Sequence, residues 1–436
     1  MKLRPFELSL IVVFIILAIG ALILLSTYKK GAEDPEKGTI FIGEVQIWGT
    51  LPEEPITLYL SELSTVNKLL AGISYRYISA EDFDAKLTEA LADGTGPDMI
   101  LTSQEHLVEQ RKRIQPISYD SFPLRDLQTN YLDGAGILGL SDGIYGYPFF
   151  VDPLMMFWNK DILTNAGFLN PPTTWEELIN VQFEKLIERE DDRSISRSVV
   201  ALGEYDNVRN AFGIISALLL QSGTAGIVES NGEYNVQLEN PVTGESQPLR
   251  NSLDFYLRFN KPSNALYSWN RSFAEDRTQF ISEELVFYFG FGSEGRVIER
   301  LNPNLNFDIA EMPQGAAADV KRTYAHIYSL APLRSADNLP GSFGVISTLG
   351  TGESITKLSA LYNMAPALRT LAAAGSNDTY GRYSYKSAAV GFGWLNPQIA
   401  ESNSVFKRVT SDISDNRRSL EAGVIDVANG LEVLYR

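Results

Sequence analysis

The chain has 436 residues, too many for one ordinary hydrophobic core, so the sequence predicts two domains. Its formal net charge of −17 at pH 7 would repel the phosphates of nucleic acid, which argues against a nucleic-acid partner. The absence of cysteine excludes disulfides, thiolate metal sites, cysteine nucleophiles and a lipid-modified N-terminal cysteine.

The N-terminus contains an uncharged apolar run over residues 8–27. Such a run can cross about 30 Å of hydrocarbon as a helix. A cleaved signal peptide is the alternative, but it needs a shorter apolar region and small residues at the cleavage site, whereas Tyr28, Lys29 and Lys30 follow here. We therefore predict an uncleaved signal anchor over 1–30. Basic residues flank the run on both sides, so charge alone leaves its orientation open.

A polar linker (GAEDPEK, 31–37) precedes the globular part of the chain. Strands are predicted over 39–48, 73–78 and 96–101. Between the last two strands, Phe83, Leu87 and Leu91 share one face of a predicted helix, which Gly94 ends. The order strand, helix, strand is typical of a parallel α/β sheet.

The stretch from Tyr145 to Trp175 is dense in structural signals. It begins with a strand, turns at Asn-Lys-Asp (159–161) and continues as a short helix that Gly167 stops. Thr174 and Glu177 then form a predicted capping box at the start of the next helix. Most of the stretch is therefore expected to serve as scaffold.

The second half of the chain has a more helical pattern. Residues 211–220 (AFGIISALLL) predict a buried helix that is too short for a second membrane span. Helices are also predicted over 253–259 and 411–435, and a surface hairpin or loop over 226–248.

Several short blocks follow one another in a consistent order. They are QIWGT (46–50), DGTGPDMI (93–100), YGYPFFVDP with FWNKD (145–161), PPTTWEEL (171–178), LLLQSG (218–223), YSWN (267–270) and NFDIAEMPQ (306–314). Together they resemble the extracellular solute-binding proteins of ATP-driven importers, in particular the sugar-binding, maltose-binding-protein-like type. The last block resembles the strand that returns between the lobes of such a protein. Region 280–295 departs from the family pattern, because two glutamates replace small and basic positions.

The resemblance implies an α/β, two-lobed periplasmic-binding-protein-like fold with a hinge and an interlobe cleft, preceded by one N-terminal transmembrane helix. The two lobes are then expected to divide the chain as follows: lobe one, 38–149 and 318–375; lobe two, 150–317 and 376–436. The protein would lie on the cell membrane as a single-pass protein with its globular part outside. There it would capture a small ligand, a mono- or oligosaccharide, and deliver it to the permease subunits of an ABC importer.

A sugar-binding cleft needs aromatic faces for pyranose rings and planar polar side chains for hydroxyl groups. Residues that follow predicted strands are favoured, because ligands of open α/β sheets lie at the carboxyl ends of the strands. The predicted ligand-binding residues are Trp48, Gln104, Glu105, Phe150, Asp152, Glu204, Tyr205, Trp269, Ser293, Glu294, Tyr328 and Trp394. The alternative for the tryptophans is a place in the core, and for the polar residues a helix start or surface turn. Trp158 and Trp175 are expected to pack structurally.

Catalysis has little support in the sequence. The two histidines, His106 and His326, occur in no metal-binding spacing and no nucleophile–base pattern. No Walker glycine loop is present, so the chain would not hydrolyse ATP itself. We predict no enzyme activity, metal or cofactor. The alternatives are a tethered ligand sensor or surface carbohydrate-binding protein without a transport role, and an extracellular carbohydrate-active enzyme with a carboxylate pair.

Overall fold

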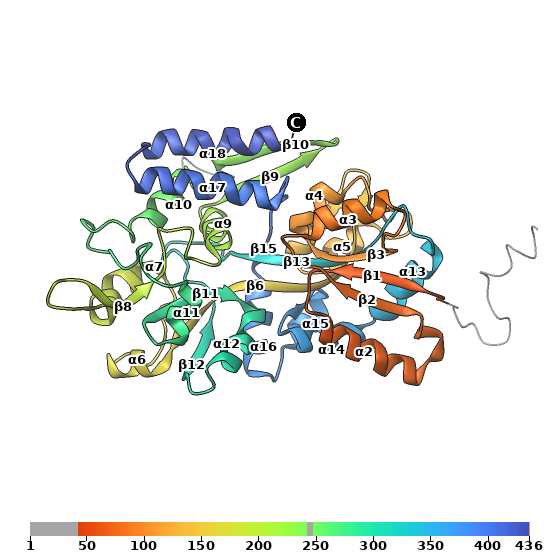
Figure 1. Cartoon of the computed structure of the whole chain (residues 1–436), viewed down its shortest axis with the longest axis horizontal. Helices are drawn as coiled ribbons and strands as arrows, with labels where there is room; N and C mark the ends of the chain where they lie inside the picture. Colours follow the sequence, from red (N-terminus) through yellow and green to blue (C-terminus); the bar gives the residue numbers. More distant parts are fainter. Residues whose placement is uncertain (1–41, 242–246, 436) are drawn as a thin grey trace, which may run out of the picture.

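The computed structural model describes residues 42–241 and 247–435 (Figure 1). The predicted anchor (1–30) and linker (31–37) lie outside the described residues. Among the residues described, no helix combines the length and apolar character needed to cross a membrane.

One mixed sheet runs through both lobes in the order β2-β1-β3-β13-β6-β11-β8-β7 (Figure 1). Its strands are β1 (Val45–Gly49), β2 (Ile73–Tyr77), β3 (Met99–Ser103), β6 (Tyr147–Asn159), β7 (Glu188–Arg189), β8 (Ile195–Val200), β11 (Leu285–Phe291) and β13 (Thr323–Pro332). The first three are parallel, as the strand–helix–strand pattern predicts. The sheet therefore places the carboxyl ends of β1 and β3 toward the second lobe.

The lobe-one part of the sheet is covered on both faces (Figure 1). Consecutive residues of β1 enter different cores: Ile47 packs in one cluster and Trp48 in the other. The helices of lobe one are α2 (Glu53–Val66), α3 (Phe83–Ala92), α4 (Leu107–Gln110), α5 (Leu124–Asn130), α13 (Leu339–Leu349), α14 (Gly352–Tyr362) and α15 (Arg369–Ala374). β3, which lies between β1 and β13, is buried at every position, whereas β1 and β2 keep exposed polar residues.

Strand β6 belongs to both lobes. Its first half pairs with β13, and its second half pairs with β11 and with β12 (Phe307–Ala310). The predicted return strand at 306–314 is wrong, because β12 pairs with residues 156–159 at the lobe-two end of β6. The chain returns through β13, which pairs with β6 and then with β3. Two long neighbouring strands thus connect the lobes.

Lobe two is built around the buried helix α9 (Ala211–Gln221). Its other main helices are α6 (Lys160–Asn165), α7 (Trp175–Glu177), α8 (Phe183–Leu186), α10 (Pro248–Leu257), α11 (Asp276–Ile281), α12 (Gly295–Leu301), α17 (Ile399–Ser414) and α18 (Leu420–Leu434). The single helix predicted over 411–435 is wrong, because 415–419 separates α17 from α18 and Asn416 has a φ of 57°. The predicted surface hairpin is formed by β9 (Thr224–Ser230) and β10 (Glu233–Pro241).

The chain passes between the lobes again after α14. It continues through β14 (Ala365–Pro366), α15, α16 (Thr379–Ala388) and β15 (Gly391–Phe392). β14 pairs with β6, and β15 pairs with the start of β13. The lobe boundaries proposed from the sequence stay predictions.

Local signals act mostly as expected. Gly94 and Gly167 have φ values of 68° and 84°, which suit glycine at the ends of α3 and α6. The Thr174 hydroxyl accepts a hydrogen bond from the Glu177 amide (3.1 Å), but the Glu177 carboxylate accepts from the Thr173 amide instead of returning to Thr174. Only half of the predicted capping box is therefore formed.

The segment 159–161 is more than a turn. The Asn159 side chain accepts a hydrogen bond from the Ile162 amide (3.0 Å) and caps α6.

Trp175 packs against Phe255 and Phe289, in agreement with its predicted structural role.

Candidate functional site

The carboxyl end of β3 brings Gln104 and Glu105 to the strands that connect the lobes. Gln104 is fully buried, and its amide accepts from the Ile327 amide (2.6 Å) and donates to the Ala325 carbonyl (3.3 Å). Both partners belong to β13. Gln104 therefore ties β3 to β13 and has little capacity left for a ligand.

Glu105 is better placed for ligand contact. Its carboxylate accepts a hydrogen bond from the Tyr324 hydroxyl (2.6 Å) and lies 3.3 Å from Nε2 of His326. The Glu105 and His326 side chains remain 13% and 19% exposed, so a small opening reaches them. Burial by itself would lower the pKa of His326, but the Glu105 carboxylate raises it above its ordinary value. An ion pair at this position is thus favoured.

Strand β13 presents a row of rings beside this ion pair. Tyr324, His326 and Tyr328 alternate along the strand and share one face, with centroids 5.8 and 6.1 Å apart. Phe291, at the end of β11, stacks on His326 with a centroid distance of 4.0 Å. Because Phe291 is the last residue of a lobe-two strand, this stack is a contact between lobe two and the connecting strand β13.

Asp152 provides a second polar contact next to the row. It lies opposite His326 in the pairing of β6 and β13. Its buried carboxylate accepts hydrogen bonds from the Ser293 amide (3.0 Å) and hydroxyl (2.6 Å). Burial raises the pKa of Asp152 to about 6. Two residues predicted from separate parts of the sequence therefore meet directly.

Glu294 also lies in the turn after β11, but its carboxylate is already engaged. One oxygen accepts from the Phe291 amide (3.0 Å) and the Asn210 side chain (2.9 Å), and the other accepts from the Tyr288 hydroxyl (2.6 Å). Arg277 approaches to 3.4 Å. Glu294 therefore holds the turn that carries Ser293.

Glu204 and Tyr205 follow β8 at the same edge of the sheet. The Tyr205 hydroxyl donates to the Asn403 side chain of α17 (2.7 Å). Burial raises the pKa of Tyr205, and the negative charge of Glu105 adds to this effect. Glu204 lies 3.7 Å from Arg271 and is held within lobe two. Tyr205 thus links the segment after β8 to α17, whereas Glu204 is held by Arg271.

The predicted aromatic platforms are enclosed by protein. Trp48 and Trp394 are 4% exposed, and Trp269 and Phe150 are fully buried. The Trp269 indole donates to Asn207 (3.0 Å), and the rings of Trp394 and Phe150 pack on Phe212 and Tyr362, respectively. In this conformation the structure supports the core alternative for these four residues, because no ring face is open to a sugar.

Part of the cluster comes from residues that the sequence did not predict as ligand-binding. Tyr324, His326, Phe291 and Asn403 were not among the predicted ligand residues, although all lie beside predicted ones. The alternation of Tyr324, His326 and Tyr328 was the available signal, because a period of two places such residues on one strand face.

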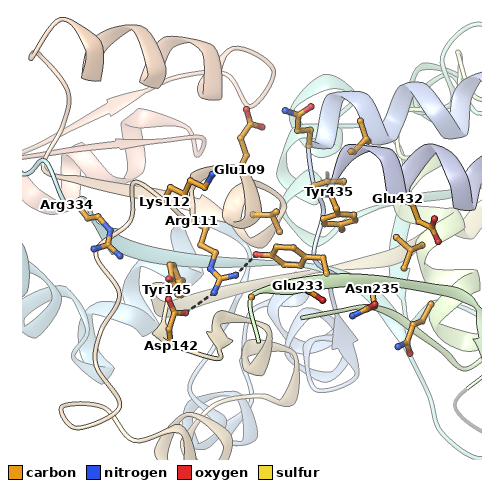
Figure 2. A pocket seen from close by; sticks show the side chains of 18 residues that line it. Glu109, Arg111, Lys112, Asp142, Tyr145, Glu233, Asn235, Arg334, Glu432 and Tyr435 are labelled. Carbon is orange, nitrogen blue, oxygen red and sulfur yellow. Dashed lines mark hydrogen bonds and ion pairs between the residues drawn. The ribbon is translucent and has the colours of Figure 1, made fainter. Parts of the chain in front are cut away.

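A separate interlobe cavity of about 1140 Å³ lies between α4 and the β9–β10 hairpin (Figure 2). Arg111 of lobe one donates to the Tyr234 hydroxyl (3.1 Å) and to Asp142 (3.0 Å) across part of this cavity (Figure 2). Tyr234 stacks on Tyr435 with centroids 5.0 Å apart. The predicted ligand residues do not line this cavity.

Within the described part of the chain, no group of three or more His, Asp or Glu side chains could hold a metal ion.

The family model of bacterial extracellular solute-binding proteins matches residues 71–380, well over half of the chain. The chain belongs to the bacterial extracellular solute-binding proteins.

Relatives of this solute-binding protein occur in two Brucella species. Proteins named as binding proteins in Brucella abortus (strain 2308) and Brucella suis biovar 1 (strain 1330) are each 31% identical to it over 98 residues. The matched stretch covers 21% of this chain and 23% of the length of each relative. These matches alone therefore describe only a part of either protein.

Two solved structures share the fold of this solute-binding protein over most of its length. A cyclo/maltodextrin-binding protein complexed with maltotetraose has a TM-score of 0.70 and 14% identity, and the match covers 89% of this chain and 96% of that one. The sugar-binding protein MalE from Xanthomonas citri has a TM-score of 0.70 and 17% identity, with coverage of 90% and 97%. The family and both neighbours are binding proteins, not enzymes.

Proposed function

We propose that this solute-binding protein captures a carbohydrate between its lobes and delivers it to the membrane subunits of an ABC importer. The observation that carries the proposal is the cluster of Glu105, Asp152, Ser293, His326 and Phe291 where β6 and β13 join the lobes. A ligand held there would contact both lobes, so its binding would favour their closure. The anchor over 1–30 would keep the protein at the outer face of the membrane.

The chemistry of the cluster suits a hydroxyl-rich ligand. Carboxylates accept hydrogen bonds from hydroxyl groups, and the stacked rings of Phe291 and His326, once separated, can contact the C–H face of a pyranose. In the structure these groups satisfy one another, as in the contacts between Asp152 and Ser293 and between Phe291 and His326. A ligand would replace these contacts. Both structural neighbours are sugar- or maltodextrin-binding proteins, which supports the same ligand class.

A thermal-shift panel tests the proposal. The full chain in detergent would be heated with neutral mono- and oligosaccharides, polyols, peptides and charged metabolites. A saccharide at 100 times its dissociation constant is expected to stabilise the protein by about 2.7 kcal/mol. Glu105→Ala is expected to reduce this shift, while Glu81→Ala, an exposed lobe-one substitution, is the matched control.

Stabilisation by peptides or charged metabolites alone would contradict the choice of carbohydrate. Equal saccharide shifts in wild type and in Glu105→Ala would contradict the location of the site.

A further inference from the structure

A further cavity lies within lobe one, and its lining includes none of the residues of the Glu105–His326 cluster. Its volume is about 870 Å³, and its walls come from residues 115–131, the start of β6, α13 and residues 368–370. Small-molecule sites usually have volumes of about 300–1,000 Å³. The size therefore suits a small ligand. All of the lining segments belong to lobe one, so opening or closure of the lobes would not separate them.

The floor of the cavity is aromatic. Phe122, Tyr131 and Tyr147 pack together with centroids 5.9 Å apart in each pair. Phe343, on α13, lines one side and is 38% exposed. It is the one phenylalanine among the strongly exposed hydrophobic residues in the described ranges. Phe343 therefore adds a ring that is partly open to solvent to one side of the cavity.

The rim of the cavity is polar and nearly uncharged. Hydroxyl and amide side chains surround the aromatic floor, from Gln115, Ser118, Ser121, Asn130, Ser347 and Thr370. Asp126 is the one charged side chain among the lining residues, so the lining offers no cation to an anionic ligand. Rings below and hydroxyl or amide groups around them suit a neutral, hydroxyl-rich ligand with an apolar face.

The walls are fixed by backbone hydrogen bonds, so the cavity is preformed. The Gln115 amide donates to the Pro332 carbonyl (2.8 Å), and Ile117 and Ile144 exchange amide–carbonyl bonds of 2.8 and 2.9 Å. On the opposite side, the Leu132 amide donates to the Ala367 carbonyl (2.9 Å). A ligand would not have to order these segments, which lowers the cost of binding.

We propose that this lobe-one cavity is a second carbohydrate site that binds a neutral saccharide without closure of the hinge. The proposal shares its ligand class with the proposed function but uses other residues. A pyranose would lie against Phe343 and Tyr147, and the rim would bind its hydroxyl groups. Each molecule would then hold two saccharides, one in the cleft and one in lobe one.

The absence of cysteine allows a selective test. Ser347→Cys, labelled with an environment-sensitive fluorophore in the full chain, reports on the rim of the cavity. Thr65→Cys, on the exposed side of α2, is the matched reference label. Maltotetraose is the saccharide probe, and a tetrapeptide of alanine and leucine is the apolar probe. Maltotetraose is expected to change the signal of the Ser347 label but not that of the Thr65 label.

Two further substitutions separate the cavity from the cleft. Phe343→Ala is expected to weaken the maltotetraose response of the Ser347 label about tenfold, because the ring loses its apolar contact. Leu58→Ala, which removes another exposed hydrophobic side chain of lobe one, is the control. Glu105→Ala is expected to leave the response of the Ser347 label unchanged, because the cavity does not depend on the cleft.

Each other outcome overturns the second site. A silent Ser347 label with an intact saccharide-induced thermal shift means that only the cleft binds sugar. A response that disappears in Glu105→Ala reports movement of the lobes instead of local binding. A response to the apolar peptide alone shows that the cavity docks protein. Failure of the proposed cleft function has a different signature. The Ser347 label then responds to maltotetraose, but Glu105→Ala changes neither this response nor the saccharide-induced thermal shift.

Discussion

Asp152 lies in the middle of β6, where burial separates its carboxyl group from water. Its two hydrogen bonds from Ser293 favour the ionised form, but burial has the larger effect and raises the pKa to about 6. An ordinary Asp in the unfolded chain has a pKa of about 3.9. Between these two pH values the folded protein therefore holds a proton that the unfolded chain has lost.

Asp152→Asn is expected to change the pH dependence of stability. Since the folded state of wild type binds more protons between about pH 4 and 6, its free energy of unfolding falls as pH rises through this window. The free energy of unfolding of the asparagine variant does not fall in this way. The difference in free energy of unfolding, variant minus wild type, should therefore rise by roughly 2–3 kcal/mol from pH 4 to pH 7. Denaturant unfolding at pH 4, 5, 6 and 7 measures the difference.

Ser293→Ala is the companion variant. It removes the hydroxyl that stabilises ionised Asp152, so the pKa of Asp152 should rise and the window should extend to higher pH. A constant difference between Asp152→Asn and wild type at all four pH values would contradict the titration of Asp152 in this range.

At the scale of elements, the β9–β10 hairpin connects lobe two to lobe one through polar side chains. Glu229 accepts hydrogen bonds from the Ser141 amide (3.2 Å) and hydroxyl (2.8 Å) of lobe one, and Arg111 lies 3.6 Å from it. The Arg111 guanidinium also lies over the rings of Tyr145 and Tyr234. The hairpin is thus held in place partly by the opposite lobe.

Arg111→Ala is expected to loosen the hairpin. Loss of the guanidinium removes its partly buried contacts with Glu229 and Tyr234. Amide hydrogen exchange over 229–237 should therefore become about tenfold faster. Exchange in the buried helix α9 should stay unchanged. Hydrogen–deuterium exchange measured by mass spectrometry reports both segments.

Lys112→Ala is the matched control, because Lys112 is exposed and lines the same cavity. Equal acceleration by both substitutions would show that the positive charge of the segment after α4, and not the specific contacts of Arg111, holds the hairpin.

At the scale of the whole molecule, the proposed function needs two parts: the lobes would capture the ligand, and the anchor would hold the protein at the membrane. The described globular part begins at Ile42, whose carbonyl accepts a hydrogen bond from the Asn338 side chain (2.7 Å) near the start of α13. The anchor would therefore join the protein at the α13 end of lobe one, where Figure 1 also places the start of β1.

Deletion of 8–27 is expected to release the protein from membranes. The full chain should stay in the membrane pellet after carbonate extraction at high pH, because only an integral apolar segment resists this treatment. The deleted variant should appear in the soluble fraction, as immunoblotting of both fractions would show. Intact-mass measurement of the full-length product is the control for processing, and a mass that lacks the N-terminal residues would contradict the uncleaved anchor.

Short-range signals determined much of this protein from sequence alone. The helix of Phe83 and Leu87, the glycines that end α3 and α6, and the first parallel strands depend on residues close together in the chain. The ordered blocks likewise indicated the solute-binding family that the family model shows. The sequence did not distinguish β12 from β13 as the strand that returns between the lobes. The distinction depends on which residues of β6 each strand pairs with.

Only the tertiary structure decided which side chains meet between the lobes. Asp152 and Ser293 are 141 residues apart, and the register of β6 with β13 places His326 opposite Asp152. The same long-range packing encloses Trp48, Trp269 and Trp394, although each was a reasonable aromatic platform by position in the sequence. Local sequence specifies the elements, whereas the exposure and partners of a side chain depend on strands and helices that arrive from distant parts of the chain.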